Sequence, residues 1–234
     1  HRSFVIMAGC FDGCSVNAKA LSHEGPLGVG YGVCTFAPAG RDDSRHFLAS
    51  YEKKERSRLA GLKESEDEYV RLARRSLEAW VRNSEKISVP EGLPSEMTSR
   101  RAGAFVSLKK HGQLRGCIGT IAATTPSVAQ EIIRNARSAA TEDPRFEPVE
   151  PQELEDLVYS VDILGDAEDI DSPQQLDVKK YGVIVSSGMK RGLLLPNLEG
   201  VDTVEQQLEI ARRKAGLGGK EPVKLQRFEV VRHY

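Results

Sequence analysis

The residues best suited to chemistry lie together in the stretch 114–120, which reads LRGCIGT. Side chains alternate along an extended strand, so Arg115 and Cys117 are expected to share one face. A guanidinium beside a thiol favours the thiolate, which is the reactive form. Gly116 and Gly119 leave space for the close approach of a ligand or of another strand. The pattern suits a nucleophilic or redox-active cysteine or an anion-binding notch. The alternative is a structural cysteine between packing glycines.

A second group of polar residues, Asp143-Pro144-Arg145-Phe146, directly follows a predicted helix. Arg145 could hold a carboxylate or phosphate through paired hydrogen bonds. In the alternative interpretation, Asp143 and Arg145 only tie down their own loop. His111 at a predicted hairpin tip is either an acid–base group or an exposed turn residue.

The elements that must position these residues are strands and helices without strict alternation. Residues 104–109 and 113–121 predict a hairpin around His111-Gly112. Further strands are expected at 157–164, 183–185, 193–195 and 223–231, and two more at 4–8, as a buried strand, and at 31–36. Residues 22–30 are rich in Gly and Pro and predict a loop.

Helices are expected on both sides of the hairpin. Residues 67–83 carry an apolar stripe at helical spacing. A second helix is expected to start with Thr125 as its cap and Pro126 as its first residue, and to stop before Pro144. A third is predicted at 203–215, with Thr203 and Gln206 in a capping box. The mixture indicates the α+β class.

Composition narrows the class of partner. The chain has 234 residues with 33 Lys and Arg against 34 Asp and Glu, so a broad electrostatic surface for nucleic acid is not expected. No apolar run approaches the ~20 residues of a membrane span, and no signal peptide is recognisable. We therefore expect a cytoplasmic protein that does not bind membranes.

The cysteines do not follow a metal-binding pattern. Cys10, Cys14, Cys34 and Cys117 match no zinc spacing, and a disulfide framework is not expected. Cys10, Cys14 and Cys34 are interpreted as small buried apolar residues. No metal ligands or cofactor are predicted for this chain.

The same blocks resemble the AMMECR family. The run 105–110, the 114–120 block, Asp143-Pro144-Arg145-Phe146 and GLLLP at 192–196 occur in the order typical of that family. The resemblance covers about residues 66–234 and is to the bacterial form labelled AmmeMemoRadiSam system protein A. It implies an α+β fold of two unequal subdomains, with mixed or antiparallel sheets flanked by helices.

The resemblance also implies site residues and partners. Cys117 and Arg115 are the expected catalytic residues of a cleft. The residues expected to bind substrate are Arg145, Asp143, Gly116, Gly119 and Thr120. The implied partners are a Memo-like protein and a radical S-adenosylmethionine (radical SAM) protein. We expect a small anionic substrate; the alternative is a non-catalytic module that binds a ligand or a partner.

Residues 1–40 resemble something different, namely the closing strands of a Memo/LigB-like domain, the fold of class III extradiol dioxygenases. Residues 41–65 are interpreted as a linker helix. The upstream part of such a domain would carry most of its ligands for a divalent metal. Ring cleavage is therefore not assigned to residues 1–234. Two strands alone are marginal in water, so this segment is expected to need a further partner.

Overall fold

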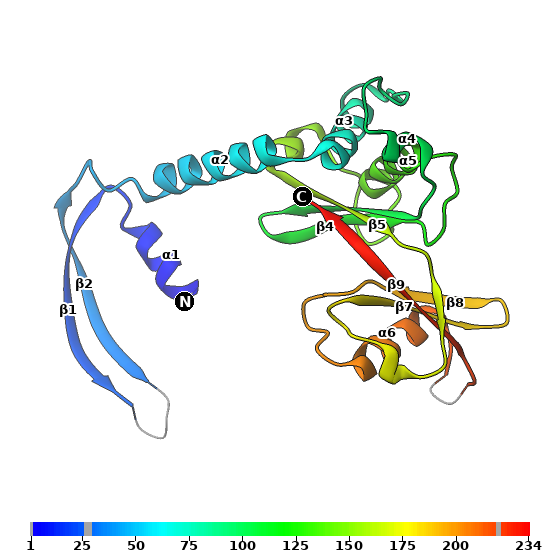
Figure 1. The fold of residues 1–234 in the computed structure, drawn as a ribbon. Helices are drawn as coiled ribbons and strands as arrows, with labels where there is room; N and C mark the ends of the chain where they lie inside the picture. Colours follow the sequence, from blue (N-terminus) through cyan, green and yellow to red (C-terminus); the bar gives the residue numbers. More distant parts are fainter. Residues whose placement is uncertain (1, 26–29, 219–220) are drawn as a thin grey trace. The chain divides into compact units, whose positions relative to one another are not determined.

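The computed structural model describes residues 2–25, 30–218 and 221–234 and divides the chain into two units, 1–61 and 62–234 (Figure 1). In the first unit, helix α1 (Arg2–Cys10) precedes two antiparallel strands, β1 (Cys14–Glu24) and β2 (Tyr31–Arg41). Helix α2 (Phe47–Ser65) begins in this unit and ends in the second.

Two expectations for the first unit are wrong. Residues 4–8 are helical instead of a buried strand, and Phe4, Val5 and Ile6 are at least 60% exposed. A short apolar run does not distinguish a strand from a helix segment, which is the physical reason for the error. The predicted loop at 22–30 is a strand as far as Glu24, and its residues 26–29 lie outside the described part of the chain.

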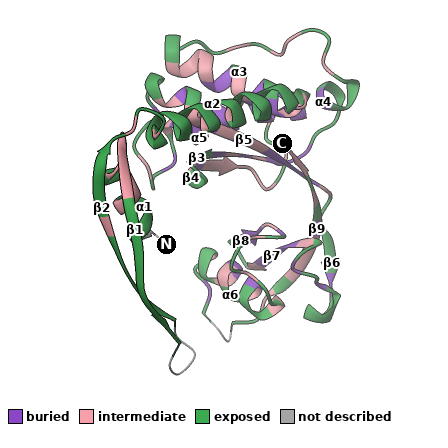
Figure 2. Cartoon of the chain, turned by 90° about the vertical axis from the view of Figure 1, so that its left-hand side faces the viewer, coloured by how far each residue is buried: buried purple, intermediate pink, exposed green. Residues whose placement is uncertain are grey.

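The first unit has no hydrophobic core among its described residues. None of the residues with described exposure between 4 and 61 is buried, and Figure 2 shows the β1–β2 pair largely exposed. Cys10 and Cys34 are exposed and Cys14 is half-buried, so the prediction that they are buried is wrong. These cysteines have no apolar interior to enter, because two strands and a short helix enclose none.

The second unit is built on one antiparallel sheet with the strand order β4-β3-β5-β9-β7-β8, and β6 also pairs with β9. The strands are β3 (Ala104–Lys110), β4 (Gln113–Gly119), β5 (Leu157–Leu164), β6 (Glu168–Ile170), β7 (Tyr181–Ser187), β8 (Lys190–Leu194) and β9 (Lys224–His233). The helices are α3 (Glu68–Asn83), α4 (Ser95–Ser99), α5 (Val128–Thr141) and α6 (Val204–Lys214), with 3-10 turns η2 (Pro151–Asp156) and η3 (Pro173–Gln175). The α+β prediction with antiparallel sheets is confirmed.

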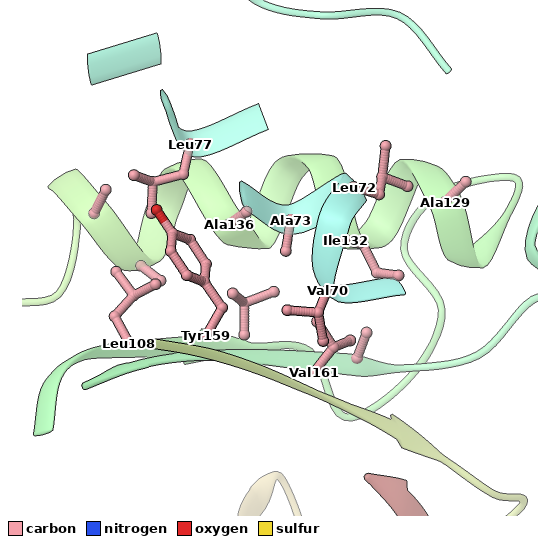
Figure 3. Packing of buried hydrophobic residues seen from close by; sticks show 14 of the residues in the cluster. Val70, Leu72, Ala73, Leu77, Leu108, Ala129, Ile132, Ala136, Tyr159 and Val161 are labelled. Carbon is pink, nitrogen blue, oxygen red and sulfur yellow. The ribbon is translucent and has the colours of Figure 1, made fainter. Parts of the chain in front are cut away.

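Two cores of unequal size divide this unit into two subdomains. In the larger, α3 and α5 pack on β3 and β5, with Leu77, Ile132, Leu108 and Tyr159 among the buried side chains (Figure 3). In the smaller, α6 packs on β7 and β8. Strand β9 joins them, because its residues 224–229 pair with β7 and its residues 230–233 pair with β5.

Helix boundaries follow local capping. Asp67 caps α3 by accepting hydrogen bonds from the backbone N–H groups of Tyr69 and Val70. Thr203 and Gln206 form the predicted capping box of α6. The predicted start of α5 is wrong: Ser127 caps it, because the Thr125 hydroxyl is bonded to Glu131 instead. No helix among the described residues is long and apolar enough to span a membrane.

Candidate functional site

A β-bulge in the hairpin decides which way the 114–120 block faces. Lys109 pairs with Leu114 and Leu108 pairs with Gly116, so Arg115 is the extra residue of β4. A bulge interrupts the alternation of side chains. Leu114 and Cys117 therefore lie on one face of the sheet, and Arg115 does not share it. The prediction that Arg115 and Cys117 lie side by side is wrong, because strict alternation was assumed across the bulge.

Arg115 binds protein groups on the helical side of the sheet. Its Nε and Nη2 donate to the two carboxylate oxygens of Glu153 at 3.0 and 2.8 Å, and Nη1 donates to the carbonyl oxygen of Glu147 at 2.9 Å. Lys110 adds a third bond to Glu153. Arg115 holds the pKa of Glu153 down at about 2. These contacts tie η2 to the hairpin and assign Arg115 a structural role.

The two glycines of the block are packing positions. A Cβ on Gly116 would lie 2.3 Å from the carbonyl oxygen of Ala139 in α5. A Cβ on Gly119 would lie 2.2 Å from the ring of Phe105, which covers this strand position. Of the two uses proposed for these glycines, the structure supports close approach by the chain itself.

Thr120 belongs to a buried network around Glu131. Its hydroxyl donates to Glu131 at 2.6 Å, and the hydroxyls and backbone N–H groups of Thr124 and Thr125 also donate to this carboxylate. Burial raises the pKa of Glu131, but these hydrogen bonds outweigh it, so the net shift is downward. The network orders the loop that leads into α5 and gives Thr120 a structural partner in place of a ligand.

Cys117 lies at one end of a polar row across three strands, with Ser107 in the middle. Ser107 pairs with Cys117 on β4 and with Ser160 on β5. The Ser107 hydroxyl donates to the Cys117 sulfur at 3.2 Å. Burial raises the pKa of the Cys117 thiol, and this outweighs the opposing effects of the Ser107 hydrogen bond and the Arg145 charge. The thiol form is therefore favoured at neutral pH, contrary to the thiolate expected from a neighbouring Arg115.

Asp143 connects Arg145 to the cysteine strand. The buried Asp143 carboxylate accepts the backbone N–H of Cys117 at 2.9 Å. It also accepts Nε and Nη2 of Arg145 at 2.9 and 2.7 Å, and Nη2 reaches the Cys117 carbonyl oxygen at 3.3 Å. The paired hydrogen bonds from Arg145 hold the pKa of Asp143 at about 2. Asp143 and Arg145 therefore tie down their own loop, and the same contacts hold Arg145 beside Cys117.

Cys117 and Arg145 open onto a cleft of about 510 Å³ formed by both subdomains. The sheet of the larger subdomain contributes a polar floor, and the segment from β8 onward contributes an apolar wall. The lining residues are Phe105, Ser107, Lys109, Leu114, Cys117, Arg145, Ser160, Asp162, Leu193, Leu195, Leu198, Lys214, Arg232 and Tyr234.

The cleft carries more positive than negative charge. Arg232 is neutralised by Asp162, with its Nε 2.6 Å from one carboxylate oxygen. Lys109 and Lys214 have no carboxylate partner among the described residues. Excess positive charge in a cleft raises the local concentration of anions. The arrangement therefore suits a small ligand with one anionic group and an apolar part.

Sequence reasoning singled out Cys117, Arg145 and Asp143 as site residues but did not name most of the other residues that line the cleft. The alternation of 105, 107 and 109 on one strand face was available as a signal for Phe105, Ser107 and Lys109. Lys214 and the leucines of the wall come from far along the chain, and only the packing of the two subdomains brings them to the cysteine. His111 has a positive φ at the exposed tip of the hairpin, as its turn interpretation requires.

No cluster of three or more metal-ligating side chains occurs in the described parts of the chain. The chemical groups in the described lining of the cleft are the Cys117 thiol, two serine hydroxyls, the Tyr234 phenol, the Asp162 carboxylate and several cations.

The fold and site define a class: an α+β domain in which a hairpin cysteine faces a cationic cleft between two subdomains. The model of the AMMECR1 family matches residues 70–233, so the chain belongs to that family. A Thermotoga maritima protein is 53% identical over 170 residues, covering 72% of this chain and 98% of that relative. The crystal structure of uncharacterized protein PH0010 from Pyrococcus horikoshii superposes with a TM-score of 0.63 at 33% identity, covering 70% of this chain and 88% of that one.

One relative also matches the first unit. Protein CA_C1420 of Clostridium acetobutylicum is 46% identical over 234 residues, covering 100% of this chain. The chain spans 49% of the length of that relative. Similarity to this relative therefore includes the β1–β2 pair as well as the AMMECR1 domain.

Proposed function

We propose that this AMMECR1-domain protein binds a small organic anion in the Cys117 cleft and presents it to the thiol as the substrate of a cysteine-dependent step. The observation that carries the proposal is the display of Arg145 beside Cys117, fixed by their shared partner Asp143. Arg145 retains Nη1 for a ligand, since no acceptor among the described residues binds that atom. Arg115 has no part in this proposal.

The neutral thiol sets a condition on the chemistry. A nucleophilic cysteine must lose its proton, and burial opposes that loss. A bound ligand that excludes water would strengthen this opposition unless it also brings a proton acceptor. The proposal therefore requires the bound ligand itself to accept the Cys117 proton, while Ser107 donates its hydrogen bond to the sulfur.

The test measures protection of Cys117 by ligands. The alkylation rate of Cys117 by iodoacetamide, followed by peptide mass spectrometry, is compared with acetate, malonate and succinate present and with their amides present. We expect the anions to slow alkylation and the amides to have little effect, because only the anions pair with Arg145. The Arg145→Gln variant should lose most of the protection, and Lys86→Gln, an exposed lysine after α3, should keep it. Equal protection by acids and amides would contradict an anion site.

We further propose, from the family resemblance, that the protein acts with a Memo-like protein and a radical SAM protein. The exposed apolar side chains of the first unit and the double length of the Clostridium relative support only the proposal that residues 1–40 pack within a larger domain. That this domain is Memo/LigB-like is proposed from the resemblance alone. The activity of the reconstituted three-part system is measured with the Cys117→Ser variant. This measurement distinguishes a catalytic role of Cys117 from a non-catalytic adaptor role of the domain. Full activity would identify the domain as a non-catalytic adaptor.

A further inference from the structure

Lys214 is a cation of the cleft that comes from the smaller subdomain, whereas Cys117 comes from the larger one. It is the last residue of α6, whereas Arg145 follows α5 and Cys117 lies on β4. All three line the same cleft. Lys214 is close enough for its charge to interact with both the Cys117 sulfur and the Arg145 guanidinium.

We infer that Lys214 and Arg145 together form an anion subsite next to Cys117. The inference rests on the proposed function, because it specifies how the same cleft holds its anion. The ligand class it names is a carboxylate, or another small oxyanion, attached to a short apolar group that lies against the leucine wall.

The charged groups described around Lys214 do not include a counter-ion for its ammonium group. The Arg145 guanidinium repels the Lys214 ammonium group, and an uncharged Cys117 thiol does not compensate for this repulsion. The remaining charged groups of the cleft are Lys109, Asp162 and Arg232, of which the last two neutralise each other. A ligand carboxylate would therefore give Lys214 the counter-ion that the described residues do not provide.

Proton coupling follows from the same surroundings. Removal of Lys214 from water lowers its pKa below that of an ordinary lysine, although the residue as a whole keeps considerable exposed surface. A bound anion favours the ammonium form and raises the pKa again. At pH values between the pKa of Lys214 in the free protein and its higher pKa in the complex, binding of the anion is accompanied by uptake of a proton by Lys214. Anion affinity should consequently fall as the pH rises through the lowered pKa of Lys214.

The experiment compares two alkylating reagents that differ in charge. Iodoacetate and iodoacetamide both react with the thiolate, so the ratio of their rates at Cys117 cancels the ionisation of the thiol. Cys34, which is exposed on β2, provides an internal reference in the same chain. The probe anion is iodoacetate itself, and the ratio is measured from about pH 7 to about pH 10.

We expect the ratio of the iodoacetate rate to the iodoacetamide rate to be about fivefold higher at Cys117 than at Cys34 near neutral pH. It should decline with rising pH in the natural protein. Lys214→Met should lower the ratio near neutral pH and approach the natural protein at alkaline pH, where Lys214 is neutral. Lys214→Arg should keep the ratio high at alkaline pH because the guanidinium stays charged. Lys86→Met serves as the matched control and should behave like the natural protein.

Two outcomes separate the inference from the proposed function. A raised ratio in the natural protein that Lys214→Met leaves unchanged would overturn the role of Lys214 and keep the anion cleft. A ratio at Cys117 no higher than at Cys34 would overturn both. Lys214 is at the end of its helix with exposed surface, so these variants are expected to fold, which circular dichroism checks.

Discussion

The Cys117 thiol lies where several opposing influences on its ionisation meet. Burial and the carboxylates of Asp162 and Asp143 raise its pKa, while the Ser107 hydroxyl and the Arg145 charge lower it. Burial is the largest of these effects. The cleft therefore holds a neutral thiol beside cations, and a neutral thiol is oxidised and alkylated more slowly than a thiolate.

Asp143 offers the clearest prediction for a single residue. Its folded-state pKa of about 2 lies below the value of 3.8 for a free carboxyl. The stabilisation is therefore fully present above about pH 4 and is lost as the pH falls through about 2. Asp143→Asn should lower the free energy of unfolding by about 2 kcal/mol at neutral pH, measured by urea denaturation.

The pH dependence distinguishes charge from shape. The difference between Asp143→Asn and the natural protein should shrink as the pH approaches the folded-state pKa of Asp143. A difference that stays constant down to acidic pH would show that the asparagine disturbs packing instead of removing a charge. The control is Asp169→Asn, which removes an exposed carboxylate paired with Lys224 and should change stability little.

At the scale of elements, the close contact of β4 with α5 supports the cysteine. Because a Cβ on Gly116 would lie 2.3 Å from the Ala139 carbonyl oxygen, Gly116→Ala must push the strand and helix apart. We expect a loss of about 2–3 kcal/mol in the free energy of unfolding. Gly61→Ala in α2 is the matched control, since its Cβ would meet no atom within 4 Å and alanine favours a helix.

The two glycine variants are compared by urea denaturation and by Cys117 alkylation. Displacement of β4 should also change the exposure of the thiol, so Gly116→Ala is expected to alter the alkylation rate and Gly61→Ala is not. Natural stability in Gly116→Ala would mean that the strand and helix tolerate the added methyl group.

Most elements of the second unit could be predicted from local signals. Turn residues, caps and alternation located the hairpin, α3, α6 and β9 because these features depend on neighbours in the sequence. The bulge at Arg115 could not be read, since it depends on the register of β3 against β4. That single extra residue moved Arg115 from the predicted site to a structural ion pair with Glu153.

The family resemblance implied a cleft near the cysteine, but most of the residues that line it could not be predicted, for a related reason. One wall comes from β8, the segment after it and α6, and the floor comes from β3, β4, β5 and β9. Their separation is fixed by the path of β9 through both subdomains and by a buried cluster of side chains from β5, β7, β8 and β9. The α1 error has a different cause: five apolar residues fit a helix as well as a strand, and in this unit no core selects between them.

At the scale of the whole molecule, the two units differ in what holds them together. The second unit has buried cores, whereas the first has none among its described residues. Apolar residues such as Phe4, Leu21, Tyr31 and Val33 are exposed in the first unit. Burial of apolar surface is the main source of folding free energy, so the β1–β2 pair is expected to be only weakly stable in residues 1–234.

Native-state hydrogen exchange tests this difference within one sample. We expect amides of β1 and β2 to exchange through local opening that costs about 1–2 kcal/mol, and those of β3 to exchange only through global unfolding at about 5–15 kcal/mol. Equal protection of the two sets would contradict the prediction. A longer chain with the additional length of the Clostridium relative should slow exchange in β1 and β2 more than in β3, because β1 and β2 expose apolar side chains that added residues could cover, whereas β3 is already largely buried.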